Sequence, residues 1–301
     1  MKKHTIVFCG EKPLGLNCLR YLHARVDVNI VAVCTRSNNK PLWYGDNLIP
    51  EYCRDNGIQV IPATELEFYD YDVLISVLFP FIIDGSHIKR AKKGAFNLHE
   101  APLPRWRGCN GYSHAILAGD VTYGTTLHIM EPVLDSGDII AMEIFPIREG
   151  ETAKELYLRT ASHSFDLFRM WLPRIFAGNY KPYAPGRDLE SYLNARNSLI
   201  PFKEMSADTP LVEVYRRTCA LDFVPWEPAH TIRAERKYYF FIGDAADRIF
   251  SKDLSSHDSL PMQKLGEIEL PESGMVLVKG FSRPLVICDE TNYCNRYPLL
   301  G

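Results

Sequence analysis

The run Thr5-Ile6-Val7-Phe8-Cys9 near the start of the chain is uninterrupted, apolar and rich in β-branched and aromatic residues. Gly10-Glu11-Lys12-Pro13 follows, and then a helix-like stretch, Leu14–His23. A short apolar run that ends at turn residues is typical of a strand that is buried on both faces. This strand and helix begin a pattern that continues to residue 98.

Four further apolar runs alternate with helix-like segments in this part of the chain. The runs are Ile30–Thr35, Ile58–Ile61, Val73–Leu78 and Ala95–Leu98, and the other helix-like segments are Asp46–Asn56 and Ser86–Ala91. Strands that alternate with helices indicate an α/β fold. We therefore predict a doubly wound, mostly parallel sheet of the Rossmann-like kind.

The next segment adds two strands and a long helix to this domain. Gly124–Met130 and Ile139–Ile147 are predicted strands, joined by the turn residues Asp135-Ser136-Gly137-Asp138. An amphipathic helix is expected from Thr152 to Phe176, because Thr152 and the glutamate three residues later form a capping box. We predict a catalytic domain at residues 1–180.

A change in composition indicates where the second domain begins. Residues 181–210 are rich in proline, tyrosine and asparagine and are predicted to be a linker. Residues 211–301 are predicted to form a small β-rich domain that begins with the helix Leu211–Leu221. Its short strands, bounded by glycine and proline, suggest a barrel-like sheet; they are Lys237–Ile242, Gly266–Leu270, Met275–Lys279 and Pro284–Cys288.

The composition is that of a globular protein. Of the 301 residues, 46% are hydrophobic and 24% charged, which excludes the disordered and fibrous classes. No apolar run is long enough for a membrane helix, so we expect no membrane partner. The eight cysteines form no C-x-x-C pair, which favours reduced thiols and a cytoplasmic location. A metal site at Cys109 is the alternative, but no second ligand pair supports it, and we expect no metal.

The segment Asn97-Leu98-His99 at the end of the fifth predicted strand carries the chemistry. Alternate residues of a strand share a face, so Asn97 and His99 point the same way and Leu98 points to the other side. Ligands of doubly wound sheets bind at this end of the strands. An amide and an imidazole there suit acyl transfer, with Asp135 as the carboxylate that orients the imidazole. Alternatively, His99 is a structural histidine and Asp135 forms a local Asx turn.

Three motifs together resemble the signature of the folate-dependent formyltransferases. They are Asn97-Leu98-His99, Leu103-Pro104-Arg105-Trp106-Arg107-Gly108 and Leu134-Asp135-Ser136-Gly137-Asp138-Ile139-Ile140. The likeness covers about the first 180 residues, and residues 266–278 are similar to the small C-terminal barrel of some members. That family includes methionyl-tRNA formyltransferases and the enzymes that formylate nucleotide-linked amino sugars.

The resemblance implies a catalytic set of Asn97, His99 and Asp135 and the cosubstrate 10-formyltetrahydrofolate. Asn97 and a protonated His99 would stabilise the oxyanion, while Asp135 would hold the charge on the histidine and help to move the proton. The residues expected to bind the folate are Leu78, Phe79, Phe81, Ile82, Leu134 and Asp138. The apolar run at 78–82 could instead be core.

Two positions depart from familiar patterns. The loop after the first strand has Lys12 where a dinucleotide fingerprint has its middle glycine, and Pro13 removes a backbone donor, so a dinucleotide is not expected. Glu100 directly follows His99, where family members often have a small residue. We expect Glu100 to contact the substrate or to perturb the histidine, the alternative being a solvated loop carboxylate.

The identity of the acceptor depends on charge. Residues 211–301 contain 11 Lys and Arg against 13 Asp and Glu, a balance of −2, whereas tRNA binding needs clustered cations. We therefore predict a nucleotide-linked amino deoxysugar and no nucleic acid, with substrate-binding residues Glu100, Arg105, Trp106, Arg107, Asn110 and Tyr112.

Three other functions remain as alternatives. They are methionyl-tRNA formylation, a non-enzymatic nucleotide-binding protein on the same fold, and a nicotinamide oxidoreductase. The altered glycine loop argues against the oxidoreductase, and the intact Asn, His and Asp argue against a protein without catalysis. A homodimer and a place in lipopolysaccharide or O-antigen biosynthesis are further expectations.

Overall fold

The computed structural model describes residues 3–36, 46–186, 192–193, 198–223, 226–242, 255–258, 263–270 and 275–290. The chain forms two compact units, each built from separated segments. The first unit comprises Met1–Gly108, Gly124–Phe145 and Arg159–Tyr192, and the second comprises Cys109–Tyr123, Pro146–Leu158 and Leu193–Gly301. The domain boundaries predicted at 1–180, 181–210 and 211–301 stay a prediction.

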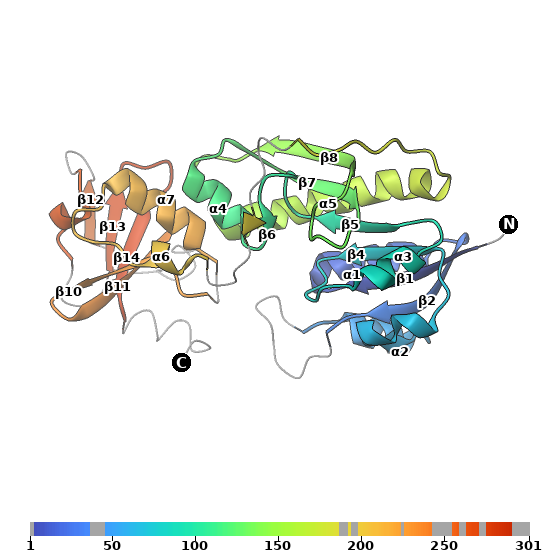
Figure 1. The fold of residues 1–301 in the computed structure, drawn as a ribbon. Coiled ribbons are helices and arrows are strands. Elements are labelled where there is room, and N and C mark those ends of the chain that lie inside the picture. Colours follow the sequence, from blue (N-terminus) through green and yellow to red (C-terminus); the bar gives the residue numbers. More distant parts are fainter. Residues whose placement is uncertain are drawn as a thin grey trace. The chain divides into compact units, whose positions relative to one another are not determined.

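The first unit is organised around a seven-stranded sheet in the order β3-β2-β1-β4-β5-β7-β8 (Figure 1). The five strands from β3 to β5 are parallel, and β7 pairs with β5 in the antiparallel direction. The prediction of a mostly parallel α/β sheet is confirmed. The strands are β1 (His4–Gly10), β2 (Val28–Cys34), β3 (Val60–Ile61), β4 (Val73–Val77), β5 (Ala95–His99), β7 (Thr122–Ile129) and β8 (Ile139–Pro146).

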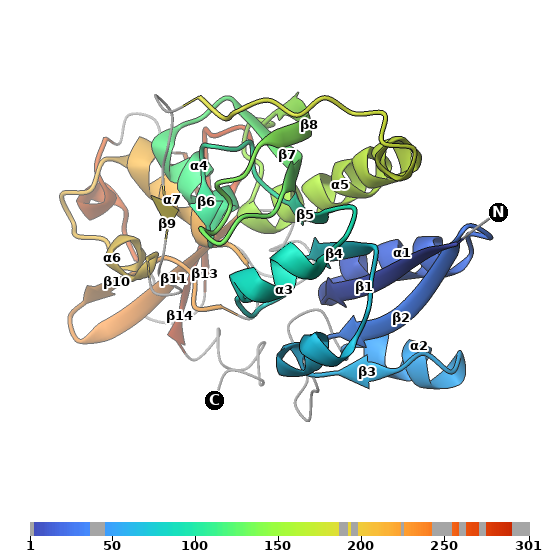
Figure 2. The ribbon, with the colours of Figure 1, turned by 45° about the vertical axis from the view of Figure 1, so that its right-hand side comes forward.

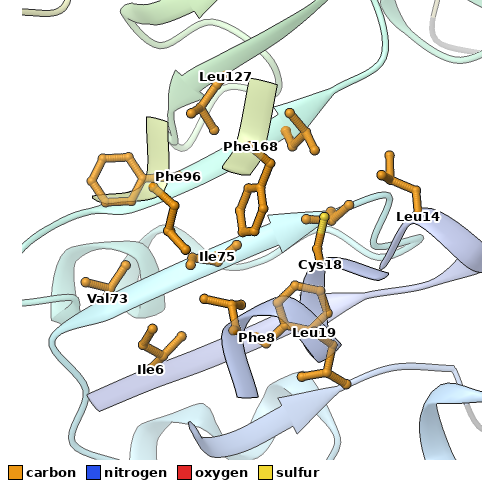
Figure 3. Close-up of a cluster of buried hydrophobic side chains, with 14 of the residues drawn as sticks. Ile6, Phe8, Leu14, Cys18, Leu19, Val73, Ile75, Phe96, Leu127 and Phe168 are labelled. Carbon is orange, nitrogen blue, oxygen red and sulfur yellow. The ribbon is translucent and has the colours of Figure 1, made fainter. Parts of the chain in front are cut away.

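Helices cover both faces of this sheet, as a doubly wound fold requires. One apolar cluster joins the sheet to α1 (Lys12–His23), α2 (Ile49–Asp55) and α5 (Ala153–Phe176). Figure 3 shows part of it, with Phe8, Ile75 and Phe168 packed between strands and helices. A second cluster packs the opposite face against the 3₁₀ helix η1 (Ala63–Phe68) and α3 (Gly85–Arg90). Figure 2 gives a second view of β2, β1 and β4 with α1 beside them.

The start of α5 follows the predicted capping box. The backbone amide of Thr152 donates to Oε2 of Glu155 at 2.8 Å, and the amide of Glu155 donates back to Oγ1 of Thr152 at 3.3 Å. Two backbone donors of the first turn are thereby satisfied, which stabilises the helix start. None of the helices in the described part of the chain has the length and apolar character of a membrane span.

The second unit contains a five-stranded sheet in the order β10-β11-β14-β13-β12. Its pairs are antiparallel except for β12 and β13, which fits the predicted small barrel-like domain. The helix predicted at Leu211–Leu221 is confirmed as α7. The strands are β10 (His230–Arg233), β11 (Arg236–Ile242), β12 (Ser255–Asp258), β13 (Met275–Lys279) and β14 (Leu285–Asp289).

One strand predicted for this unit is wrong. Residues Leu265–Glu267 form a short 3₁₀ helix, η3, where the sequence predicts the strand Gly266–Leu270. The amide of Gly266 donates to the carbonyl oxygen of Ala207, and a Cβ on Gly266 would meet that oxygen at 3.0 Å. This close backbone approach turns the chain away from an extended path. The remaining short elements are β6 (Arg107–Gly108), α4 (Gly111–Ala118), β9 (Tyr192–Leu193) and α6 (Ile200–Lys203).

Candidate active site

Strand β5 presents Asn97 and His99 on one face, as the sequence predicts. Leu98 between them is 1% exposed and belongs to the apolar core, whereas Asn97 and His99 are only partly buried. The alternation of side chains along a strand produces this division. Both polar residues lie at the carboxyl end of the parallel sheet, next to the end of β4.

Asp135 lies in the turn between β7 and β8 and reaches both of these side chains. Its Oδ1 is 3.4 Å from Nδ2 of Asn97 and 3.6 Å from Nδ1 of His99. Its Oδ2 accepts a hydrogen bond of 3.1 Å from the backbone amide of Gly108. Asp135 is 7% exposed, and its backbone has a φ of 52°, a left-handed conformation that costs energy outside glycine. The predicted Asn, His and Asp cluster is therefore assembled in space.

Both ring nitrogens of His99 face acceptor atoms. Nδ1 faces the Asp135 carboxylate, and Nε2 is 3.4 Å from the backbone oxygen of Trp106. A neutral imidazole has one N–H, whereas the imidazolium has two. The surroundings therefore suit a charged His99 that can donate a proton or a hydrogen bond.

Hydroxyl groups of β7 fix the end of β5 and the loop that follows it. Thr125 donates to the carbonyl oxygen of His99 at 3.1 Å, and Thr126 donates to that of Ala101 at 2.7 Å. Thr126 also accepts from the amide of Leu103 at 3.1 Å. Because Thr125 and Thr126 are fully buried, these bonds are protected from water and hold the site rigidly.

Gly137 allows the Asp135 turn to close. A Cβ at this position would lie 1.9 Å from the carbonyl oxygen of Ile129, a distance that no side chain can tolerate. The turn is also held by the backbone amide of Ile129, which donates to the carbonyl of Asp138 at 2.9 Å. Glycine is thus required two residues after Asp135 for the backbone to approach β7 closely.

His128 joins the site, although it was not predicted from the sequence. It lies on β7 directly opposite Asn97 on β5, and its Nε2 is 3.0 Å from Nδ2 of Asn97 and 3.8 Å from Oδ1 of Asp135. It is 1% exposed. The only signal in the sequence is a histidine within a predicted strand, and nothing in the sequence gives its partner across the sheet.

The predicted substrate residues of the first unit are mostly buried. Trp106 is 8% exposed with a φ of 63°, and the guanidinium of Arg105 lies 4.5 Å from its ring centre. Arg107 is 7% exposed and donates from Nη2 to the carbonyl oxygen of Leu134 at 2.5 Å. It therefore connects the loop after β5 to the turn of Asp135. A role of these residues in substrate binding stays a prediction.

Glu100 is 4% exposed, so the alternative of a solvated loop carboxylate is wrong. Burial raises the pKa of the Cys18 thiol on α1, and the charge of Glu100 raises it further. Glu100 thus lies close to α1, while the preceding residue, His99, faces Asp135. Its predicted contact with the substrate stays a prediction.

Asn110 and Tyr112 belong to the second unit. Asn110 has a φ of 62° and donates from Nδ2 to Oγ of Ser198 at 3.3 Å. Tyr112 contacts the rings of Tyr123 and Tyr157, with ring centres 5.3 and 5.5 Å away. Both side chains contribute to the packing of this unit, and their predicted role in substrate binding stays a prediction.

The predicted folate residues include several apolar side chains on the surface. Phe81 is 55% and Ile82 is 81% exposed, so the alternative that they are core is wrong for these two. Phe79 packs edge-to-face against Phe81, with ring centres 5.5 Å apart. Exposed apolar groups at the carboxyl end of a parallel sheet suit a flat heterocyclic ligand. Leu78 is partly buried with a φ of 55°, Leu134 is 43% exposed, and Asp138 is exposed.

The cysteines of the described residues are all free thiols, buried except for Cys109. Within the described part of the chain, no group of three or more His, Cys, Asp or Glu residues is arranged to hold a metal ion.

Known proteins with formyltransferase activity are similar to this chain. Residues 58–169 match the family model described as formyl transferase. The methionyl-tRNA formyltransferase of Myxococcus xanthus is 29% identical over 247 residues, which cover 77% of this chain and 76% of that protein.

Two solved structures share the fold. The N-formyltransferase of Helicobacter canadensis, solved with folinic acid and dTDP-3-aminofucose, has a TM-score of 0.70 and 20% identity, over 96% of this chain and 100% of that one. WlaRD, a sugar 3N-formyltransferase solved with dTDP and 5-N-formyltetrahydrofolate, has a TM-score of 0.69 and 18% identity, over 96% and 98% of the two chains. With the Asn97, His99 and Asp135 cluster in place, the resemblance to the folate-dependent formyltransferases that the sequence predicts is confirmed.

Proposed function

We propose that this enzyme transfers a formyl group from 10-formyltetrahydrofolate to the amino group of a nucleotide-linked amino deoxysugar. The observation that carries the formyl-transfer step is the convergence of Asn97, His99 and Asp135 at the carboxyl end of β5. The choice of acceptor rests on the charge of the C-terminal segment.

The cluster has the groups that acyl transfer to an amine requires. The acceptor nitrogen attacks the formyl carbon, a C–N bond forms, and the carbonyl oxygen becomes an oxyanion. His99 and Asn97 would donate hydrogen bonds to this oxyanion, with Asp135 stabilising the charged imidazole. The bond from the formyl carbon to the folate nitrogen then breaks, and the proton lost by the amine is delivered to that nitrogen through His99 and Asp135. The products are the formamide and tetrahydrofolate.

The residues after β4 fit the folate. 10-Formyltetrahydrofolate supplies the formyl group as cosubstrate, and its flat ring system needs an apolar surface. Phe79, Phe81 and Ile82 offer such a surface next to the end of β5, and Leu134 offers one beside Asp135. The solved relatives with bound folates support this assignment.

The acceptor is proposed from the charge of the C-terminal segment. Residues 211–301 have a net charge of −2, whereas a protein that grips tRNA uses several Lys and Arg side chains to neutralise phosphates. A nucleotide-linked sugar carries a pyrophosphate that one or two cations can neutralise. The H. canadensis enzyme, solved with dTDP-3-aminofucose, matches this chain over both units and supports the proposal.

The second candidate is methionyl-tRNA formylation. It is favoured by the relatives in sequence, which include the M. xanthus enzyme at 29% identity over three quarters of both chains. The sugar acceptor would suit a place in lipopolysaccharide or O-antigen biosynthesis and a cytoplasmic enzyme. A homodimer stays a prediction.

The salt dependence of the reaction with each acceptor tests the proposal. Formyl transfer from 10-formyltetrahydrofolate is measured to nucleotide-activated 3-amino and 4-amino deoxysugars and to charged initiator tRNA, at 50 and 200 mM salt. We expect a sugar to be formylated with weak salt dependence, because few counterions are released. With about 6–10 phosphate contacts, tRNA affinity would fall roughly 10³–10⁵-fold over this range. Efficient, salt-sensitive formylation of tRNA, with no sugar accepted, would overturn the sugar assignment.

A further inference from the structure

The ring of His128 has one defined protonation state in this site. Its Nδ1 is 2.8 Å from the backbone carbonyl oxygen of Ile129, which can only accept a hydrogen bond, so Nδ1 carries the hydrogen. Burial lowers the pKa of His128 to about 4, an effect that Asp135 opposes and that the charges of His99 and Arg107 reinforce. At neutral pH the ring is uncharged, and Nε2 is a bare acceptor.

This acceptor determines how the amide of Asn97 is turned. Nδ2 of Asn97 lies 3.0 Å from Nε2 of His128 and 3.4 Å from Oδ1 of Asp135. If the amide were reversed, its oxygen would face the lone pair of His128 and the carboxylate of Asp135, and both contacts would be repulsive. The two acceptors therefore keep the NH₂ group on this side.

The two hydrogens of that NH₂ group have different tasks. One is held by His128 at 3.0 Å. The distances of 3.0, 3.4 and 3.8 Å among Nδ2, Nε2 of His128 and Oδ1 of Asp135 place the two acceptors only about 73° apart as seen from Nδ2, whereas the two N–H bonds of an amide diverge by about 120°. The second hydrogen therefore points past Asp135. The 3.4 Å contact with Asp135 is long and weak. An oxyanion that develops in the transition state can take this second hydrogen at little cost.

We propose that His128 is a positioning residue that acts through Asn97: its unprotonated Nε2 holds one amide hydrogen so that the other stays directed at the reacting carbonyl. This inference rests on the proposed formyl transfer but is independent of whether the acceptor is a sugar or tRNA. A wild-type enzyme that formylates no acceptor would refute the proposed function itself. The role of His128 is tested within an active enzyme.

A double-mutant cycle separates this role from a structural one. His128→Leu removes the acceptor, and His128→Gln keeps one, the Oε1 atom, at a similar distance from the backbone. Each is made in the wild type and in Asn97→Ala, with His163→Gln, a partly exposed histidine that pairs with Glu143, as the control. Thermal melting is recorded for every variant, and kcat and KM are measured for both substrates.

We expect His128→Leu to lower kcat by about 10-fold or more with KM nearly unchanged, since loss of one oxyanion donor costs roughly 10²–10³-fold and here the donor is only misdirected. His128→Gln should recover most of this loss, and His163→Gln should match the wild type. In the Asn97→Ala background, His128→Leu should have almost no further effect. Equal losses in both backgrounds, or a His128→Gln enzyme as poor as His128→Leu, would overturn the proposal.

A measurement on the wild-type protein keeps the inference testable if His128→Leu does not fold. Nitrogen-15 NMR of labelled histidine distinguishes a ring with hydrogen on Nδ1 from one with hydrogen on Nε2. We expect His128, assigned by the loss of its signals in His128→Gln, to be neutral with hydrogen on Nδ1 at pH 7. A hydrogen on Nε2 at that pH would contradict the proposed acceptor role.

Discussion

The guanidinium of Arg107 donates a hydrogen bond of 2.5 Å to the backbone oxygen of Leu134, so the loop after β5 and the turn of Asp135 hold each other. The residues that follow this pair in the chain, Gly108 and Asp135, are also joined, because the carboxylate of Asp135 accepts from the amide of Gly108. The position of the Asp135 carboxylate therefore depends on a cation that the sequence suggested for substrate binding.

Replacing Arg107 with methionine should destabilise the protein by about 1–3 kcal/mol, because the carbonyl oxygen of Leu134 loses the charged donor that the buried Arg107 supplies. We expect kcat to fall as Asp135 becomes less well held. Arg107→Lys keeps the charge but not the planar fork, so it should recover only part of the loss. Urea unfolding and steady-state kinetics measure both effects. A large rise in KM for the acceptor with unchanged stability would show that Arg107 binds substrate instead.

Gly137→Ala should distort the turn of Asp135, because its Cβ would lie 1.9 Å from the carbonyl oxygen of Ile129. That oxygen also accepts from Nδ1 of His128, so the substitution disturbs two parts of the site. We expect a loss of about 1–3 kcal/mol in unfolding free energy, as for other overpacked sites, together with reduced kcat. Gly186→Ala is the matched control, since its Cβ would meet nothing within 4 Å. Similar behaviour of the two variants would contradict the argument.

The catalytic assignments predict large losses of turnover without unfolding. His99→Asn and Asp135→Asn should each abolish most formyl transfer, because both act on the proton and the oxyanion rather than on the core. Asn97→Ala should lower kcat by about 10²-fold or more with little change in KM. Steady-state rates and circular dichroism measure the two properties. Near-wild-type rates for His99→Asn or Asp135→Asn would contradict the catalytic assignment of that residue. A rise in KM with unchanged kcat in Asn97→Ala would mean that Asn97 binds substrate rather than stabilising the oxyanion.

The exposed aromatic ring of Phe81 tests the proposed folate surface. Phe81→Ser should raise the KM for 10-formyltetrahydrofolate while stability changes little, because the side chain is already 55% exposed without ligand. Phe68→Ser, at a ring that is 76% exposed on η1, is the matched control and should leave this KM unchanged. An unchanged KM in Phe81→Ser would exclude this ring from the folate surface.

The buried carboxyl of Asp222 should make the stability of the second unit depend on pH. Burial raises its pKa to about 6, although its Oδ2 accepts from the amide of Ile242 at 3.1 Å. Between pH 4 and 6 the unfolded chain loses this proton while the folded chain retains it, so stability falls as pH rises through this range. A raised pKa of this size corresponds to about 3 kcal/mol.

Denaturant unfolding at pH 4.5 and 7 measures this effect. Asp222→Asn should lose most of the Asp222 contribution, because the amide stays neutral and can still accept from Ile242. Asp208→Asn, at a carboxylate whose side chain is 88% exposed, should keep the wild-type pH dependence. If the free energy of unfolding differs between the two pH values by the same amount in Asp222→Asn and in the wild type, the Asp222 carboxyl does not cause the pH dependence.

Much of the first unit follows from the sequence because its signals are local. Neighbours along the chain determine the apolar runs and helices of residues 5–98, the two strands that flank Asp135, and the Thr152 capping box. The alternation of side chains on β5 likewise predicted that Asn97 and His99 share a face. The proline- and glycine-rich C-terminal region carried weaker signals, and at Gly266–Leu270 a contact with Ala207 replaced the expected strand.

The sequence by itself determined which residues could carry the chemistry: an amide and an imidazole two positions apart on one strand, and a carboxylate on a turn. Only the tertiary structure decided how those groups are held. The antiparallel register of β5 and β7 places His128 opposite Asn97, and the packing of the loop after β5 buries Arg107 against Leu134. Register and loop packing join residues far apart in the chain, and their energies come from burial and from hydrogen bonds between strands. A pattern within one segment cannot contain that information.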